Sequence, residues 1–344
     1  MHYNIQLSIF FILISALLSH FYIFKRAPIS LKILLTLSLI SGLAYSFLDV
    51  NLNFDLISRA NLRIISGKSL SFLFMFVFFV FSMGKKAFTN FVKIMIWSTI
   101  ASSIMTIIMY FINLTQAWGL GLNTSTEGSY LSIMLPIVLF SNRPLLLNKN
   151  YWNLLRLLPI IAILFTGSSM GLFCGAFSIA IYYMAKNRIF LVPFFSFLLI
   201  SAIFYAFYGD QIISSSGRIE NWRLFIDWFL EHGNMLTGQG LGSFWGYGPY
   251  IQRLKNPDQF FVFVNAHNDW LQIFFELGAI GFFFSIISFF AILRKSISAP
   301  MLFSAFLTFG INAAMNMPLR YPITALAGLM ITRIIIENEN KKHS

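Results

Sequence analysis

Long apolar stretches separated by short polar breaks run through most of the sequence. The stretches at residues 190–207 and 271–293 are unbroken, and several others approach the ~20 residues that cross a bilayer as a helix. Backbone polar groups find no water inside lipid, so a spanning segment must be a helix or part of a closed barrel. Unbroken apolar runs lack the alternation of barrel strands. The pattern therefore predicts an all-α polytopic membrane protein.

We expect about eleven transmembrane helices and one large extracytoplasmic loop. About eight spans fall within residues 1–208, the loop covers residues 209–269, and about three spans fall within residues 270–344. The first apolar stretch lacks a basic leader and a small-residue cleavage site, so we interpret it as a retained span. The predicted spans are residues 5–24, 31–48, 69–83, 91–112, 126–140, 154–166, 170–185, 189–208, 270–293, 300–317 and 321–336.

Composition and charge agree with this topology. The chain is 58% hydrophobic and 10% charged, whereas a soluble domain carries about 25% charged residues. The net charge of +12 would suit nucleic acid, but the basic residues lie between apolar runs. Sixteen of the 24 basic residues lie in connections on one side, and ten of the 12 acidic residues lie on the other. The positive-inside rule makes the first side cytoplasmic, so we expect the N-terminus outside and the C-terminus inside.

The first part of the large loop has the pattern of an amphipathic helix that Ser215 or Ser216 can cap. Its apolar face comprises Ile219, Trp222, Ile226 and Phe229. Its polar face comprises Glu220, Arg223, Asp227 and Glu231. We expect this helix to lie along the membrane interface with the apolar face toward lipid.

Arg218 falls in the first turn of this helix, where a cation opposes the helix dipole and adds no helix stability. Arginine beside free helix N–H groups can instead bind an anion. A solvated arginine without a specific role is the alternative interpretation.

Residues 238–248 read Gly-Gln-Gly-Leu-Gly-Ser-Phe-Trp-Gly-Tyr-Gly and form a glycine-rich turn. No strand–turn–helix context surrounds them, so a dinucleotide site is not indicated. Tight turns let the backbone approach a ligand closely. Phe244, Trp245 and Tyr247 suit either sugar faces or an aromatic belt at the membrane interface.

His267 lies where the loop re-enters the membrane. A histidine at such a boundary can take up a proton near neutral pH, although a structural hydrogen bond is an equal alternative. No two histidines have the spacing of zinc ligands, so we expect no metal site.

Three segments occur in order: Gly217-Arg218 with Trp222, Gly238-Gln239-Gly240-Leu241-Gly242-Ser243-Phe244, and Ala266-His267-Asn268-Asp269-Trp270-Leu271-Gln272 with Glu276-Leu277-Gly278-Ala279-Ile280-Gly281. Together they resemble the O-antigen ligase and polymerase family over about sixty-five residues. The hydrophobic layout and Met317-Pro318-Leu319 extend the resemblance loosely over most of the chain.

This resemblance implies a bacterial inner-membrane glycosyltransferase of the GT-C type, with its large loop in the periplasm. The donor would be an undecaprenyl-diphosphate-linked oligosaccharide. The acceptor would be lipid A–core for a ligase, or another lipid-linked glycan for a polymerase. No nucleotide sugar, metal, other cofactor or nucleic acid is expected. If the roles of the family's residues hold at the matching positions, Arg218 would contact the diphosphate and His267 would be the catalytic residue.

The chain departs from the family pattern at one point. Many relatives have Ser-Arg after the short sixth span, where this chain has Thr166-Gly167-Ser168-Ser169-Met170-Gly171. A second diphosphate contact must then come from elsewhere or be absent, and Arg59, Arg63, Arg253 and Arg320 are the candidates. The residues expected to bind substrate are Trp222, Arg253, Asn268, Asp269 and Arg320, of which Asn268 or Asp269 could orient the imidazole.

The expected chemistry also suits these residue types. An arginine fork binds phosphate oxygens as negative charge grows on a leaving diphosphate. A base removes the proton of the sugar hydroxyl that attacks. A single displacement at the anomeric carbon predicts inversion.

A transporter or flippase of lipid-linked oligosaccharide is the alternative from another class. It would place ionisable residues at mid-span and use paired broken helices. Arg156, Glu276 and Arg333 instead lie near span ends, where long side chains can reach water. Within the enzyme class, the sequence does not separate ligase from polymerase, because acceptor choice depends on loop shape.

Overall fold

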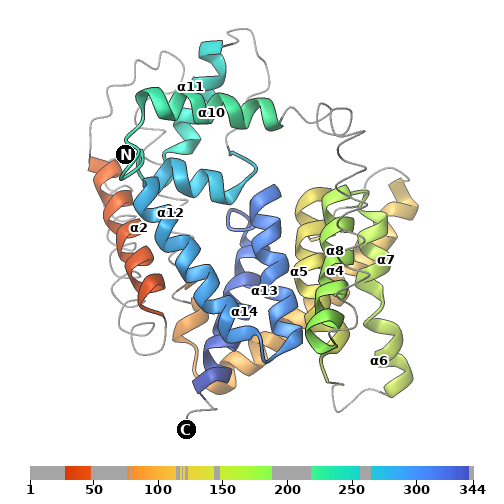
Figure 1. The fold of residues 1–344 in the computed structure, drawn as a ribbon. Helices are drawn as coiled ribbons and strands as arrows, with labels where there is room; N and C mark the ends of the chain where they lie inside the picture. Colours follow the sequence, from red (N-terminus) through yellow and green to blue (C-terminus); the bar gives the residue numbers. More distant parts are fainter. Residues whose placement is uncertain are drawn as a thin grey trace, which may run out of the picture. The chain divides into compact units, whose positions relative to one another are not determined.

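The computed structural model describes residues 28–47, 76–77, 79–113, 117, 119–120, 123–142, 148–187, 218–255 and 265–340. Within these ranges the chain forms helices and turns and no strand, which confirms the all-α prediction there (Figure 1). The chain divides into two compact units. Unit 1 comprises Met1–Phe81 and Phe197–Ala291, and unit 2 comprises Ser82–Ser196 and Ile292–Ser344.

The described helices coincide with most of the predicted spans. They are α2 (Ile29–Phe47), α4 (Lys85–Asn113), α5 (Thr124–Phe140), α8 (Ser169–Lys186), α12 (Asp269–Ser296), α13 (Pro300–Met315) and α14 (Pro322–Asn340). Among the described residues, Lys85–Ile112 and Asp269–Ser296 are long and apolar enough to cross a membrane. The predicted spans 5–24 and 189–208, and most of 69–83, lie outside the described residues. The count of eleven therefore stays a prediction.

Helix α5 forms the centre of unit 2. It packs against α4, α8, α13 and α14, and the side chains of residues 126–139 are all buried. Two glycines let α5 and α8 approach closely, since a Cβ placed on Gly171 would lie 2.7 Å from the Cα of Gly128. Small residues of this kind are typical of helix contacts in membranes, where close backbone packing replaces the hydrophobic effect.

The predicted span 154–166 is interrupted. It begins within α6 (Lys149–Leu155) and continues as α7 (Leu158–Phe165), which has a proline in its first turn. Proline lacks the N–H that a continuous helix would require, so a new helix starts there. Arg156 in the turn donates to the carbonyl oxygen of Leu139 at 3.2 Å, near the C-terminal end of α5. This arginine is therefore tied to a helix end.

Polar side chains inside unit 2 bond to one another. The Glu127 carboxylate accepts hydrogen bonds from Ser102 at 2.6 Å and Thr106 at 3.1 Å, and all three residues are fully buried. The Asn316 amide donates to the hydroxyls of Ser129 at 2.7 Å and Ser125 at 3.0 Å. Such bonds stabilise helix contacts where no water is present.

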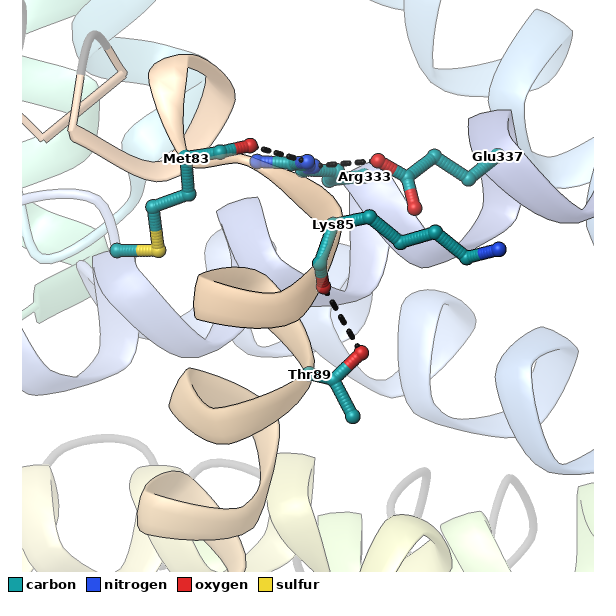
Figure 2. Close-up of polar contacts among 5 residues, drawn as sticks. All are labelled: Met83, Lys85, Thr89, Arg333 and Glu337. Atoms are coloured by element: carbon teal, nitrogen blue, oxygen red, sulfur yellow. Dashed lines mark hydrogen bonds and ion pairs between the residues drawn. The ribbon is translucent and has the colours of Figure 1, made fainter.

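Arg333 is buried near the C-terminal end of α14, with 6% of its surface exposed. Figure 2 shows its guanidinium between two oxygen atoms, those of Glu337 at 2.7 Å and the Met83 carbonyl at 2.8 Å. The guanidinium carbon also lies 3.9 Å from the ring centroid of Phe88. The sequence suggested that this side chain reaches water, but it instead joins α14 to the start of α4.

Candidate functional site

The core of unit 1 is an aromatic cluster between three helices: α10 (Arg218–His232), α11 (Phe244–Lys255) and the first half of α12. Its buried members are Phe225, Phe229, Phe244, Tyr247, Ile251, Ala266 and Phe275. The rings of Phe229 and Phe244 each lie 5.1 Å from the ring of Phe275, measured between centroids. This packing fixes α10 against the beginning of α12, and Figure 1 shows these helices together.

The amphipathic helix predicted in the large loop is confirmed as α10, but its buried face is rotated. Phe225 and Phe229 are each 1% exposed, whereas Ile226 is 38% exposed. The polar residues Glu220, Arg223, Asp227 and Glu231 are exposed as predicted. The apolar face is rotated because it packs against α11 and α12, which the sequence of α10 alone does not reveal.

Two aromatic residues of the glycine-rich turn, Phe244 and Tyr247, are part of this core. Phe244 is 0% exposed and Tyr247 is 5% exposed, so both rings are packed against protein, and Trp245 is partly exposed. Burial raises the pKa of the Tyr247 phenol to about 12. For Phe244 and Tyr247, the structure shows packing within the core of unit 1 in place of the predicted sugar face or interfacial belt.

The glycine-rich turn meets a break in α12. At Gly278 the backbone leaves the helical region, with φ 65° and ψ −168°. The break frees carbonyl and N–H groups of α12, and residues 235–240 bond to them. The bonds run from Gln239 N to Phe275 O (3.0 Å), Gly240 N to Glu276 O (2.9 Å), Ala279 N to Met235 O (2.8 Å) and Ile280 N to Leu236 O (3.2 Å). The backbone of this turn therefore closely approaches α12.

A substitution at Gly278 tests this arrangement. Its φ and ψ lie in a region that only glycine occupies readily, and a Cβ there would lie 2.4 Å from the Leu236 carbonyl oxygen. We expect Gly278→Ala to destabilise the fold by at least about 2 kcal/mol, seen as a lower thermal midpoint in detergent. Gly84→Ala is the matched control, since nothing lies within 4 Å of a Cβ at Gly84. Equal midpoints for the two variants would contradict the close backbone contact.

The segment before α12 is held from both sides. The indole N–H of Trp222 on α10 donates to the Ala266 carbonyl oxygen at 2.6 Å. On the other side, the Ala266 N–H donates to Oε1 of Gln272 at 3.3 Å. The next residue, His267, has φ 52°, the only positive φ at a non-glycine residue in the described chain. Backbone strain of this kind costs about 1–3 kcal/mol and is common at functional sites.

His267 and Arg218 interact electrostatically. Burial and, as the smaller cause, the positive charge of Arg218 together lower the pKa of His267 from 6.5 to about 4. Burial also lowers the pKa of Arg218, although a guanidinium remains charged in proteins. At neutral pH the structure therefore pairs an unprotonated imidazole with a cation, an arrangement that can accept a proton beside a bound anion.

The other predicted site residues have different positions. Asn268 accepts from the Leu271 N–H at 3.0 Å, which caps α12. Asp269 is buried in the first turn of α12. Arg253 is in the last turn of α11, and Arg320 belongs to unit 2, between α13 and α14. Arg59 and Arg63 lie outside the described residues.

The segment that lacks the family's arginine is a helix start. The Ser168 hydroxyl accepts from the Gly171 N–H at 3.0 Å, and the Ser168 N–H donates to the Thr166 hydroxyl at 3.2 Å. These two bonds explain why a serine occupies this position, where it is the N-cap of α8.

Two residues of the site had no role in the sequence interpretation. Gln272 and Glu276 are fully buried, and the amide nitrogen of Gln272 donates to the Glu276 carboxylate at 2.8 Å. The available signal was two polar residues four positions apart in an otherwise apolar run, which places them on one helix face.

Comparison with known proteins shows which family this part of the chain resembles. A family model described as O-antigen ligase matches residues 154–286, which include α10, α11, Arg218 and His267. No curated protein matches the chain. The family is one of membrane enzymes of the glycosyl-transfer type that act on lipid-linked glycans. This match over residues 154–286 confirms the resemblance to the O-antigen ligase family that was inferred from the sequence.

Proposed function

We propose that this protein transfers an undecaprenyl-diphosphate-linked glycan to an acceptor sugar hydroxyl during surface polysaccharide synthesis. The observation that supports this most directly is the unprotonated His267 beside the charged Arg218, inside the segment that matches the family. A diphosphate ester needs a cation for its leaving group, and a hydroxyl acceptor needs a base. The two side chains supply these two functions.

In the proposed reaction, His267 takes the proton of the acceptor hydroxyl as that oxygen bonds to the anomeric carbon. The bond between this carbon and the diphosphate oxygen breaks, and its electron pair remains on the diphosphate. Arg218 stabilises that growing negative charge. One displacement inverts the configuration at the anomeric carbon. The proposal uses no metal ion.

The remaining site residues have narrower proposed roles. Trp222 and Asn268 bond to backbone groups, so we assign them to holding the His267 segment. Asp269 stays a candidate for orienting the imidazole. Arg253 and Arg320 are the described candidates for a second diphosphate contact, which the missing family arginine leaves open.

The proposed location is the bacterial inner membrane, with residues 209–269 in the periplasm, the N-terminus outside and the C-terminus inside. The excess of basic residues in alternate connections supports this orientation. Lipid-linked donors would then meet Arg218 and His267 at the periplasmic surface. Residues 1–208 and 270–344 would form the two groups of spans on either side of the loop.

The broken α12 does not favour the transporter alternative. In transporters, broken helices leave backbone groups free to bind a substrate or an ion. Here the groups at Phe275, Glu276, Ala279 and Ile280 are bonded to residues 235–240. The break therefore holds the glycine-rich turn.

Reconstitution in liposomes tests the function. The purified chain would be given lipid-linked repeat units, with and without lipid A–core, and the products separated by size. Longer lipid-linked chains alone would show a polymerase, and capped lipid A–core would show a ligase. Movement of donor across the bilayer without any new glycosidic bond would refute the proposed transfer and support a flippase.

The pH dependence follows from the state of His267. Because burial and Arg218 lower the pKa of His267 to about 4, the reactive neutral form persists well below pH 6.5. We expect kcat/KM to stay level from neutral pH down to about pH 5 and to fall through a midpoint near 4. Activity regained on return to neutral pH would exclude denaturation. A midpoint at 6.5 or above would contradict a buried base beside a cation.

A further inference from the structure

A continuous series of hydrogen bonds connects α10 with the interior of α12. Trp222 donates to the carbonyl of Ala266, the N–H of Ala266 donates to Gln272, and Gln272 donates to Glu276. The side chains of Gln272 and Glu276 are 0% exposed. All four residues of this series belong to unit 1, and the residue that follows Ala266 is His267.

The order of donors and acceptors in this series is fixed by chemistry. An amide side chain can point its oxygen or its nitrogen either way, and its neighbours decide. The Ala266 N–H is a donor and requires the oxygen of Gln272. The Glu276 carboxylate is an acceptor and requires the nitrogen. Both neighbours thus favour one orientation of Gln272. The opposite orientation would place its amide N–H against the Ala266 N–H and its oxygen against the Glu276 carboxylate.

This fixed amide determines where the Ala266 peptide lies. With its carbonyl bound by Trp222 and its N–H bound by Gln272, Ala266 has little freedom. The strained backbone of His267, at φ 52°, persists only where surrounding contacts enforce it. Trp222 follows Arg218 by one helical turn on α10. The bonds that hold Ala266 therefore also hold the backbone of His267 close to the helix that carries Arg218.

We propose that Gln272 and Glu276 act together as positioning residues that hold His267 beside Arg218 for glycosyl transfer. This inference rests on the proposed function. Neither side chain needs to touch the substrate. Their effect is expected on kcat more than on KM, because a reacting group misplaced by about 1 Å can cost ~10²-fold in rate.

The test exchanges the two side chains. Gln272→Glu removes the donor to Glu276 and places two carboxyl groups together, so we expect kcat to fall by about 100-fold. Adding Glu276→Gln keeps the acceptor for the Ala266 N–H at position 272 and restores one donor–acceptor pair between positions 272 and 276, with the parent's net charge. The double variant Q272E/E276Q is therefore expected to recover kcat to within about fivefold of the parent, with KM similar throughout.

The pH profile supplies a second signature. In Q272E, two carboxyl groups facing each other share a proton as the pH falls, which makes one of them a donor again. We expect kcat of Q272E to rise between pH 7 and pH 5, while the parent and the double variant show no rise. Gln252→Glu is the matched control, since Gln252 is also buried in unit 1 but bonds to Gly248. A buried carboxylate there should lower stability without this recovery.

The outcomes separate the two proposals. If Q272E does not accumulate as folded protein, Gln272→Met keeps the volume, removes both bonds and adds no charge. Parental kcat in Q272M, or a folded but inactive double variant, would overturn the positioning role. Full activity in both His267→Asn and Arg218→Ala, measured in parallel, would instead overturn the proposed function itself.

Discussion

Replacing His267 is expected to abolish most of the transfer activity, by about 10²–10⁴-fold in kcat, because the acceptor hydroxyl would lose its base. Asparagine is the preferred substitution, since it tolerates the left-handed backbone at φ 52° better than alanine. Asparagine cannot take up the proton at any accessible pH. The fall in activity at acid pH should therefore disappear in this variant. The small activity that remains should not depend on pH.

The measurement is glycan transfer in liposomes with equal amounts of folded protein, judged by thermal midpoint and size-exclusion profile in detergent. His232→Asn is the matched control, because His232 is the last residue of α10, is exposed and stacks on Trp228 at 5.3 Å between centroids. It should retain parental activity. A His267→Asn variant with the same kcat as His232→Asn would remove His267 from the reaction.

The helical architecture was predictable because it depends on local patterns. Lipid forces backbone groups to bond within the segment, so an apolar run such as 270–293 is readable as a helix from sequence. The same run did not reveal the break at Gly278, since an isolated glycine in a helix is ordinarily tolerated. The break exists because residues 235–240 bond to the freed groups, and that contact spans about forty residues of sequence.

The candidate site was predictable in part for a similar reason. Arg218 and His267 could be named as candidates because their residue types suit the chemistry and because their order resembles a family. The prediction that Ile226 belongs to the buried face of α10 was wrong. Phe225 is buried instead, because its ring packs against that of Phe244 at 4.8 Å between ring centroids. Gln272 and Glu276 gained no role from sequence, because the partner that explains them is the backbone of Ala266.

Replacing Arg218 is expected to weaken transfer by about 3 kcal/mol, or roughly 10²-fold, because the leaving diphosphate would lose a fixed cation. Arg218→Lys should lose less, since it keeps the charge but not the fork that matches phosphate oxygens. Arg223→Ala is the control on the exposed face of the same helix, and it should behave as the parent. Transfer rates with the lipid-linked donor at saturating and limiting concentration separate the effects on kcat and KM.

Arg218→Ala should also change how His267 titrates. The Arg218 charge is the second cause of the lowered pKa of His267, after burial. Its removal should move the acid limb of kcat/KM upward from about 4 without reaching 6.5, since burial remains. Arg218→Lys should move the limb less. A loss of rate in Arg218→Ala with the limb unmoved would mean that the guanidinium and the imidazole act in separate environments, and the paired mechanism would fail even though each residue matters.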